Sequence, residues 1–468
     1  MSSWLTLLVQ LAVASAIGVG VVAACRWVER RSPLCARLVA AGLLVRAGMM
    51  LILFWTSFLN VPMLRQQHTG DGFWRLLPDA RVYYRLAFTA AHDGFGTIVR
   101  GGPSPAFVKA LALWMRAVGS SPMSGPYLNL VVYVLLCVTI VAAFRPAGNR
   151  RTDLPCALMV AAVSFSPVLV IHSAEPLKDS MFVFLIGIVC VAAFAFLPML
   201  TMTSGVLRRP GAGVLTAAIF LAALYVISGI RAYYAAIVWS ALALVLTACA
   251  WRQRRLVRYA AVCVLLLAAG WRTYMTGADL DYINPYRTVI DSAMVATLDY
   301  YRSGFVTTPG GTSVRPSRPA PRPQPAEEGA PSSIERPSAA SSGVVDRLTA
   351  VGVGLSLLFV PVSALRMLSI VSFSGGRGLL AITDVDTLFM DLTIAAGIAF
   401  LLRRRSAIRG QLPYVAFVVV LATASALLMA YVVTNFGTLF RLRLMVAAPL
   451  WMLPLALSAR VEHERCAG

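Results

Sequence analysis

The sequence predicts an all-α polytopic membrane protein with about eleven transmembrane helices. Its 468 residues are 59% hydrophobic and only 13% charged, whereas soluble globular chains carry about 25% charged residues. Many segments approach the ~20 apolar residues that cross a bilayer as a helix. Helices are expected because they satisfy their own backbone hydrogen bonds in lipid, and a β-barrel would show short alternating segments instead. The lipid bilayer is therefore the first expected partner.

Eleven apolar segments are long enough to be spans. They cover residues 4–25, 38–60, 127–144, 154–172, 180–200, 214–230, 233–250, 257–271, 388–402, 411–431 and 443–459. The first of these has no basic residues before it, so we expect a retained helix and not a signal peptide.

The net charge of +21 does not indicate nucleic-acid binding, because most of the arginines form short clusters between the spans. Five clusters alternate correctly: 26–37, 144–153, 208–209, 252–258 and 403–410. The positive-inside rule places all five in the cytoplasm. We therefore expect a multi-pass protein of the inner or plasma membrane, with its N-terminus outside and its C-terminus cytoplasmic.

This orientation divides the chain into three regions. Residues 1–271 form an N-terminal transmembrane module with a large first outer loop, 61–126. Residues 272–387 form a second outer segment, in which the Pro-rich stretch 307–345 cannot bury a core and is expected to be disordered. Residues 388–468 form the C-terminal transmembrane helices.

Three stretches of the outer segments are apolar on one side or throughout. PDARVYYRLAFTAAHDG and SPAFVKALALWMRAVG, both in the first outer loop, have an apolar stripe and a polar face, which is typical of helices lying along a membrane surface. GVGLSLLFVPVSALRMLSIV, in the second outer segment, is expected to be interfacial or re-entrant, because counting it as a span would break the arginine alternation.

The first group of informative residues follows the second span. Asp79 comes directly after Pro78 at the start of an expected helix, with Tyr83 and Tyr84 about one turn later and Asp71 before it. A first-turn acid also stabilises a helix through its dipole, so a capping role for Asp79 is an open alternative. The gathering of acids and tyrosines just above the lipid favours a functional role.

The second group lies in HSAEPLKDS, a very short link between two spans. It contains His172, Glu175, Lys178 and Asp179. Lys178 is one of only two lysines in the chain. A solvated turn with an internal ion pair would explain the group equally well, but charges of both signs held at an interface also suit a phosphate beside a working carboxylate.

Three arginines are expected at the outer face, against the positive-inside trend. Arg441 and Arg443 fall near the start of the last span, and Arg231 is wedged between two spans. Arginine binds phosphate oxygens in a bidentate manner, although snorkelling to lipid headgroups is the alternative. With the two groups above, these cations predict one outer cavity that binds a lipid-anchored phosphate while a carboxylate takes a proton from an attacking hydroxyl.

The sequence resembles the GT-C superfamily of integral-membrane glycosyltransferases. The resemblance covers most of the chain outside the Pro-rich stretch and rests on four segments: PDARVYYRLA, ALALWMRAVGSSPMSGPYLNLVVYVLL, FSPVLVIHSAEPLKDSMFVFLIG and NFGTLFRLRLMVAAP. It implies a GT-C-like fold and a polyprenyl-phosphate sugar as donor, with a glycan, lipid or protein as acceptor.

The resemblance also implies roles for particular acids. Asp79 matches the expected catalytic base of the first outer loop best, with Asp71 as a weaker match, and Glu175 or Asp179 matches a second acid in the next outer turn. The first loop has DAR where sharper members have an adjacent acidic pair, so metal dependence is open: a divalent metal is possible but not indicated, and the lipid-linked sugar is the expected donor. The C-terminal soluble domain of some members is missing.

Other classes of membrane protein remain open at this point. A transporter or flippase of lipid-linked glycans would need charges near mid-membrane and paired halves, whereas the charges here are expected at one face. A polymerase of lipid-linked oligosaccharide also uses large outer loops. An acyltransferase would need a His/Asp arrangement inside the spans, which the sequence does not offer.

Overall fold

The structure of the protein, a computed structural model, describes most of the chain. It covers residues 3–253 apart from 63–64, 66, 76, 99–102, 147–149 and 202–209, and then residues 314–316, 344–373, 377–432 and 436–458. The expected span 257–271 and nearly all of the Pro-rich stretch 307–345 lie outside these residues.

The described part is almost entirely helical, as expected. Its first half consists of α1 (Ser3–Arg31), α2 (Pro33–Phe58), α3 (Pro78–Asp93), η2 (Phe95–Thr97), α4 (Pro105–Val118), α5 (Ser124–Phe144), α6 (Arg150–Phe165), α7 (Pro167–Ser173), α8 (Asp179–Thr201), α9 (Pro210–Ile230) and α10 (Ala232–Gln253). Its second half consists of β1 (Val314–Pro316), α14 (Val344–Phe359), α15 (Val362–Met367), β2 (Val371–Phe373), α16 (Arg377–Arg403), α17 (Arg405–Ile408), η4 (Arg409–Gln411), α18 (Leu412–Val432), α19 (Phe436–Leu442), α20 (Leu444–Trp451) and η5 (Leu453–Leu457).

Multiple helices are long and apolar enough to cross a membrane. Within the described residues there are nine, and a tenth if the bent pair α6–α7 counts as one span. These ten correspond in order to the expected segments other than 257–271. The multi-pass architecture is therefore supported, whereas the count of about eleven is not confirmed.

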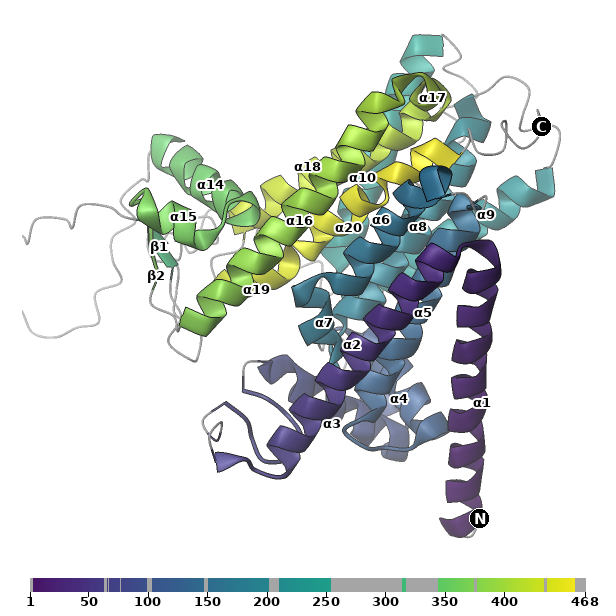
Figure 1. Cartoon of the computed structure of the whole chain (residues 1–468), viewed down its shortest axis with the longest axis vertical. Coiled ribbons are helices and arrows are strands. Elements are labelled where there is room, and N and C mark those ends of the chain that lie inside the picture. The colour runs from purple at the N-terminus through teal and green to yellow at the C-terminus, as the bar shows by residue number, and fades with distance from the viewer. Residues whose placement is uncertain are drawn as a thin grey trace, which may run out of the picture. The chain divides into compact units, whose positions relative to one another are not determined.

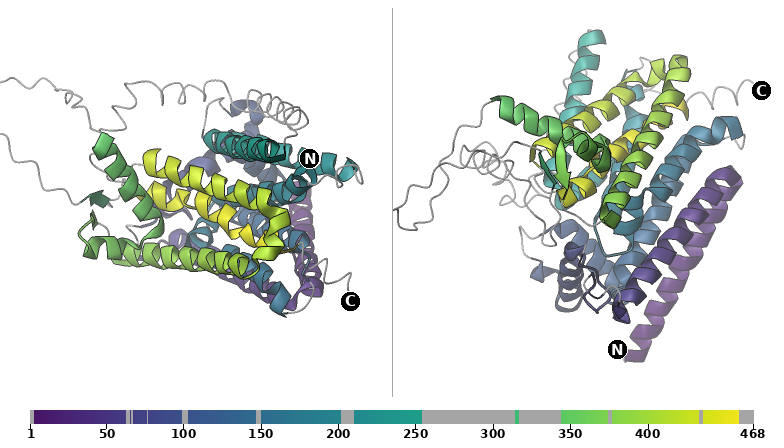
Figure 2. Two further views of the ribbon diagram at one scale, coloured as in Figure 1. Left: turned by 90° about the horizontal axis from the view of Figure 1, so that it is seen from above. Right: turned by 60° about the vertical axis from the view of Figure 1, so that its left-hand side comes forward.

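The chain forms two compact units. Unit 1 contains residues 1–283, 389–425 and 444–468, and unit 2 contains 284–388 and 426–443. Within unit 1, α3 and α4 lie at the same end as the start of α1, and α17 lies at the opposite end together with the junction of α1 and α2 (Figure 1). Helix α1 stands at the edge of this unit (Figures 1 and 2).

The two amphipathic segments of the first loop are helices, as expected. Helix α3 begins at Pro78 and α4 at Pro105, because proline is suited to the first helical turn, where its missing N–H is not needed. Tyr83 of α3 packs edge-on against Phe107 of α4, with 5.4 Å between the ring centroids. The two helices thus pack against each other, and α4 also packs against α1, α5 and α9.

The expected span 154–172 is not one straight helix. It divides into α6 and α7, which meet at an angle of 51°. The break falls at Ser166 and Pro167: Ser166 has an extended ψ of 117° and its hydroxyl accepts a hydrogen bond from Leu169 N. Proline inside a helical run removes one backbone hydrogen bond and clashes with the preceding turn, so the break has a local cause that the apolar pattern had hidden.

Unit 2 contains the expected interfacial stretch and the first turns of α16. The stretch is not a single helix, because α14 ends at Phe359 and α15 begins at Val362, after Pro361. Helix α16 begins at Arg377, eleven residues before the expected boundary at 388, so Asp386 is helical and buried instead of lying in an outer loop.

Candidate functional site

The charged link between α7 and α8 is buried, not solvated. His172, Glu175 and Asp179 are 5%, 2% and 1% exposed, so the solvated-turn alternative is wrong. The Asp179 carboxylate also reaches beyond the link and meets Arg231, which lies between α9 and α10. Arg231 Nη2 donates to Asp179 Oδ1 at 2.6 Å, and His172 Nδ1 is 3.8 Å from Asp179 Oδ2.

The Arg231 guanidinium contacts Asp179 and Phe182, and its Nε–H has no acceptor among the described residues. Its guanidinium carbon is 4.7 Å from the ring centroid of Phe182, one turn into α8. Among the residues that the structure describes, none accepts a hydrogen bond from Arg231 Nε, although the side chain is buried. A buried guanidinium with an unmet donor suits an anion that arrives from outside the protein.

Lys178 points toward the start of α4. Its ammonium donates to Ser104 Oγ at 2.5 Å and lies 5.5 Å from the ring centroid of Tyr83. Ser104 Oγ in turn donates to the carbonyl of Ile230 at 3.2 Å. Ser104 therefore connects the two cations: it accepts a hydrogen bond from Lys178 and donates one to Ile230, the residue before Arg231.

Ser104 has a backbone conformation that serine rarely adopts. Its φ is +55°, in the left-handed region, although it precedes Pro105. A residue before proline normally prefers an extended backbone, and a non-glycine residue at positive φ carries strain of about 1–3 kcal/mol that the surroundings must hold. Such outliers gather at functional sites. Ser104 was not among the residues predicted from the sequence, where its only signal is its place before a helix-starting proline.

Six side chains thus form one group at the α3–α4 end of unit 1. We call it the polar cluster: Tyr83, Ser104, His172, Lys178, Asp179 and Arg231. Five of these were singled out from the sequence. The cluster brings together α3, the start of α4, the α7–α8 link and the α9–α10 junction.

Asp79 lies one turn from the polar cluster. It is half-buried in the first turn of α3, and four residues, or about 6 Å of helix axis, separate it from Tyr83. Asp71, its rival, forms a partly exposed ion pair with Arg81 at 2.6 Å. Tyr84 turns to another face of α3, where its hydroxyl donates to the carbonyl of Ser120 at 2.9 Å.

Glu175 holds the first loop onto the α7–α8 link. Its Oε1 accepts a hydrogen bond from Trp74 N at 2.8 Å, while no described residue donates to Oε2. Asn129 of α5 holds the same link through its Nδ2, which donates to the carbonyl of Glu175 at 2.7 Å. Burial raises the pKa of Glu175 from 4.5 to about 8, because water is excluded from the carboxylate. Glu175 is therefore mostly protonated at neutral pH.

The loop that carries Trp74 is tied to the end of α2. Trp74 Nε1 donates to the carbonyl of Leu53 at 2.9 Å, and Ser57 Oγ donates to the carbonyl of Phe73 at 2.9 Å. His68 pairs with Trp74 through a backbone bridge. The loop before α3 is therefore held by hydrogen bonds both to the end of α2 and to Glu175 of the α7–α8 link.

Arg441 and Arg443 belong to unit 2, and Arg443 has partners there. Arg443 is buried, forms an ion pair with Asp386 and donates to Thr387 Oγ1 at 2.6 Å. Arg441 is half-buried. Within unit 2, Arg443 joins α16 to the end of α19. Whether these two arginines meet the polar cluster stays a prediction.

Arg46 is a charged residue that lies far from either end of its span. Arg46 is in the middle of α2 and only 2% exposed, so the expectation that charges cluster at one face was incomplete. Its guanidinium donates to backbone carbonyls of α6. The apolar run around it concealed it in the sequence.

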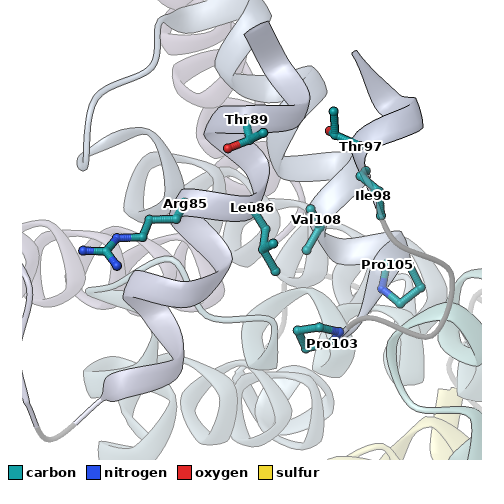
Figure 3. Close-up of a pocket in the computed structure, with 8 residues that line it drawn as sticks. All are labelled: Arg85, Leu86, Thr89, Thr97, Ile98, Pro103, Pro105 and Val108. Atoms are coloured by element: carbon teal, nitrogen blue, oxygen red, sulfur yellow. The ribbon is translucent and has the colours of Figure 1, made fainter. Parts of the chain in front are cut away.

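A cavity of about 240 Å³ opens between α3 and α4. Leu86 and Val108 face it from the two helices, Pro103 and Pro105 close one side, and the Arg85 guanidinium lies apart from these apolar groups (Figure 3). None of the expected site residues lines it. Ser104 of the polar cluster lies between the two prolines in the sequence but does not line the cavity.

Within the described ranges, no three His, Cys, Asp or Glu side chains gather closely enough to hold a metal ion. No family model, curated protein or solved structure matches the chain.

Glu175 makes the stability of the protein depend on pH. Because its pKa is about 8 in the folded state and near 4.5 when unfolded, the folded state binds the proton more tightly, so stability falls as pH rises between these values and then levels off. Glu175→Gln keeps an oxygen for Trp74 N but removes the titration. We expect the variant to gain on the order of a few kcal/mol over the wild type across this window.

Thermal unfolding of both proteins at about pH 5 and about pH 9 measures this difference. The advantage of Glu175→Gln should be small at the lower pH and large at the higher one. An equal difference at both pH values would mean that Glu175 is not buried as a neutral acid.

Proposed function

We propose that the protein is a membrane glycosyltransferase that moves a sugar from a polyprenyl-phosphate donor to an acceptor glycan, lipid or protein. The reaction takes place on the outer face of the cell membrane, at the α3–α4 end of unit 1. The observation that carries this proposal is the polar cluster, where Lys178 and Arg231 are linked through Ser104 one turn from Asp79.

The two cations form the phosphate site. Lys178 is half-buried, and its flexible stem allows the ammonium to move from Ser104 to a phosphate oxygen. Arg231 presents a buried Nε with no acceptor among the described residues. Asp179 and His172 act as positioning residues, because the carboxylate fixes the Arg231 guanidinium at 2.6 Å and contacts His172. The ring face of Tyr83 stabilises the Lys178 ammonium through a cation–π contact.

Asp79 is the general base of a single, inverting displacement. An acceptor hydroxyl attacks the anomeric carbon of the donor sugar, and Asp79 takes the hydroxyl proton. The bond between that carbon and the phosphate oxygen breaks, and polyprenyl phosphate leaves with its electron pair and one added negative charge. Lys178 and Arg231 stabilise this charge. Asp71, which forms an ion pair with Arg81, is the alternative base.

Glu175 shapes the site rather than reacting in it. Its neutral carboxyl is occupied by Trp74 N on one oxygen, and it holds the loop that leads into α3 and Asp79. Tyr84 has a similar supporting role, since its hydroxyl ties α3 to Ser120.

A transporter of lipid-linked glycans is the second candidate, and Arg46 inside a span is the observation that favours it. Its guanidinium donates to backbone carbonyls, those of Val163 and Ser164 at the end of α6 and that of Gly42 one turn earlier in α2. Cleavage of the sugar–phosphate bond separates the two functions, because a transporter releases its lipid intact.

Binding of the donor phosphate can be followed through the two lysines. Lys109 is exposed on α4 and Lys178 is half-buried, so peptide mapping after brief acetylation reports both in one sample. We expect polyprenyl phosphate to slow the acetylation of Lys178 at least threefold while Lys109, the internal control, reacts as before. Polyprenol without phosphate should protect neither, and equal protection by polyprenol would show that no phosphate is bound.

The role of Asp79 is tested by Asp79→Asn. Asparagine keeps the size of the side chain and its place in the first turn of α3, so the protein should fold. Sugar transfer from a labelled polyprenyl-phosphate donor should fall about 10²–10⁴-fold, the usual contribution of positioned proton transfer. Protection of Lys178 by polyprenyl phosphate should be unchanged. Asp71→Asn is the matched control and should keep most of the activity; if instead Asp79→Asn were fully active, Asp79 would be a helix-start residue only.

A further inference from the structure

Arg46 occupies an unusual place for an arginine. It lies near the middle of α2, a helix of 26 residues, and is only 2% exposed. Charged side chains within a span are costly in lipid and are retained where they have a task. Among the described residues, no carboxylate forms an ion pair with Arg46. Its charge must be balanced in another way.

Backbone carbonyls at the end of α6 balance it. Arg46 Nη2 donates to the carbonyl of Val163 at 2.6 Å, and Nη1 donates to the carbonyl of Ser164 at 2.5 Å. The guanidinium also lies 4.1 Å from the ring centroid of Tyr133. A cation at the C-terminal end of a helix is favourable, because the helix dipole is negative there.

The cause of this arrangement is the break at Pro167. In an unbroken helix the N–H of residue 167 would donate to the carbonyl of Val163, four residues earlier, but proline has no N–H. In lipid a carbonyl left without a donor is costly, and neighbouring helices must supply one. Arg46 supplies it, and so stabilises α6 and α7 in their bent arrangement of 51°.

Helix packing holds the same joint in place. Tyr133 OH is 2.8 Å from Ser164 Oγ and donates to the carbonyl of Val39 at 3.0 Å. A Cβ at Gly42 would lie 2.3 Å from the Tyr133 hydroxyl oxygen and 2.7 Å from Ser164 Cβ. The helices are therefore as close at this point as glycine allows, and the end of α6 cannot move closer to α2 or α5.

The C-terminal end of α7 is held by α5, the helix that carries Tyr133. Asn129, one turn before Tyr133 on α5, donates from Nδ2 to the carbonyls of Ser173 at 3.4 Å and Glu175 at 2.7 Å. A Cβ at Gly125, one turn earlier again, would lie 2.2 Å from Pro176 Cβ. The segment that leads into the α7–α8 link is thus held at both ends. Lys178 follows Glu175 by three residues, so its position depends on this segment.

We infer that Arg46 is a positioning residue for the polar cluster: by holding the end of α6 at its break, it sets where α7 and the link begin, and so where Lys178 stands. Arg46 does not touch the cluster itself. The inference rests on the proposed function only in its last step, from the placement of Lys178 to binding of the donor phosphate.

The first test is a thermodynamic cycle between Arg46 and Pro167. Arg46→Met should lower the midpoint of thermal unfolding, because the Val163 carbonyl loses its donor. Pro167→Ala restores an N–H four residues on, so Arg46→Met should cost less in that background than in the wild type. Arg37→Met, an exposed arginine of the same helix, is the matched control and should change little in either background. Equal losses in both backgrounds would overturn the link between Arg46 and the break.

The second test reads the position of Lys178 without any enzyme activity. Arg46→Lys keeps the charge but cannot span two carbonyls with a planar fork, so it should fold. We expect the acetylation rate of Lys178, relative to Lys109, to change at least threefold in Arg46→Lys and in Arg46→Met/Pro167→Ala, and not in Arg37→Met. Unchanged ratios in both folded variants would show that Arg46 serves stability alone.

The same samples separate the two proposals. If the ratio changes but polyprenyl phosphate never protects Lys178 in the wild type, the positioning role stands and the proposed function fails. If polyprenyl phosphate protects Lys178 in the wild type but the acetylation ratio is unchanged in both Arg46 variants, the positioning role fails and the proposed function stands.

Discussion

The buried ion pair between Asp179 and Arg231 is the interaction on which the rest of the site depends. Each charge alone would be very costly among apolar helices, and removing one partner of such a pair typically costs about 3–5 kcal/mol. The pair joins the start of α8 to the α9–α10 junction with a separation of 2.6 Å. It thereby fixes the neighbours on either side, Lys178 and Ile230, which meet at Ser104.

A pair of this kind is weak support for stability, because well-packed apolar residues often replace buried ion pairs at no loss. Three neighbouring features are likewise not explained by stability. Ser104 is held at positive φ, Arg231 Nε lacks a described acceptor, and Glu175 is buried with a pKa of about 8. Each is unfavourable for folding by itself. Their presence at one end of unit 1 supports the proposed ligand site there, and a phosphate is the ligand that Lys178 and Arg231 suit best.

The sequence predicted the elements that rest on local patterns. Long apolar runs predicted the spans, and the apolar stripes after Pro78 and Ser104 predicted α3 and α4. It also singled out Lys178, Asp179 and Arg231, because charge is rare in so apolar a chain. The pairing of Asp179 with Arg231, 52 residues apart, could not be read, since it depends on how the helices pack.

The failures have the same physical origin. The break at Pro167 was hidden because a bent span is as apolar as a straight one. Arg46 was hidden because its counter-charge is a helix end, formed by backbone carbonyls that have no signature in the sequence. Ser104 was missed because its role comes from Lys178, 74 residues later. The start of α16 at Arg377 was misplaced because Asp386 is charged, and its partner, Arg443, is distant in the sequence.

The central claim is that the charges of the polar cluster are retained for a phosphate ligand and not for the fold. The most direct test replaces the whole pair, Asp179→Leu with Arg231→Met, and measures both thermal unfolding and binding of polyprenyl phosphate. The account predicts that the double variant folds with a midpoint near that of the wild type, because no buried charge is left unpaired, and that it no longer binds polyprenyl phosphate. A double variant that folds and binds polyprenyl phosphate as tightly as the wild type would contradict the account.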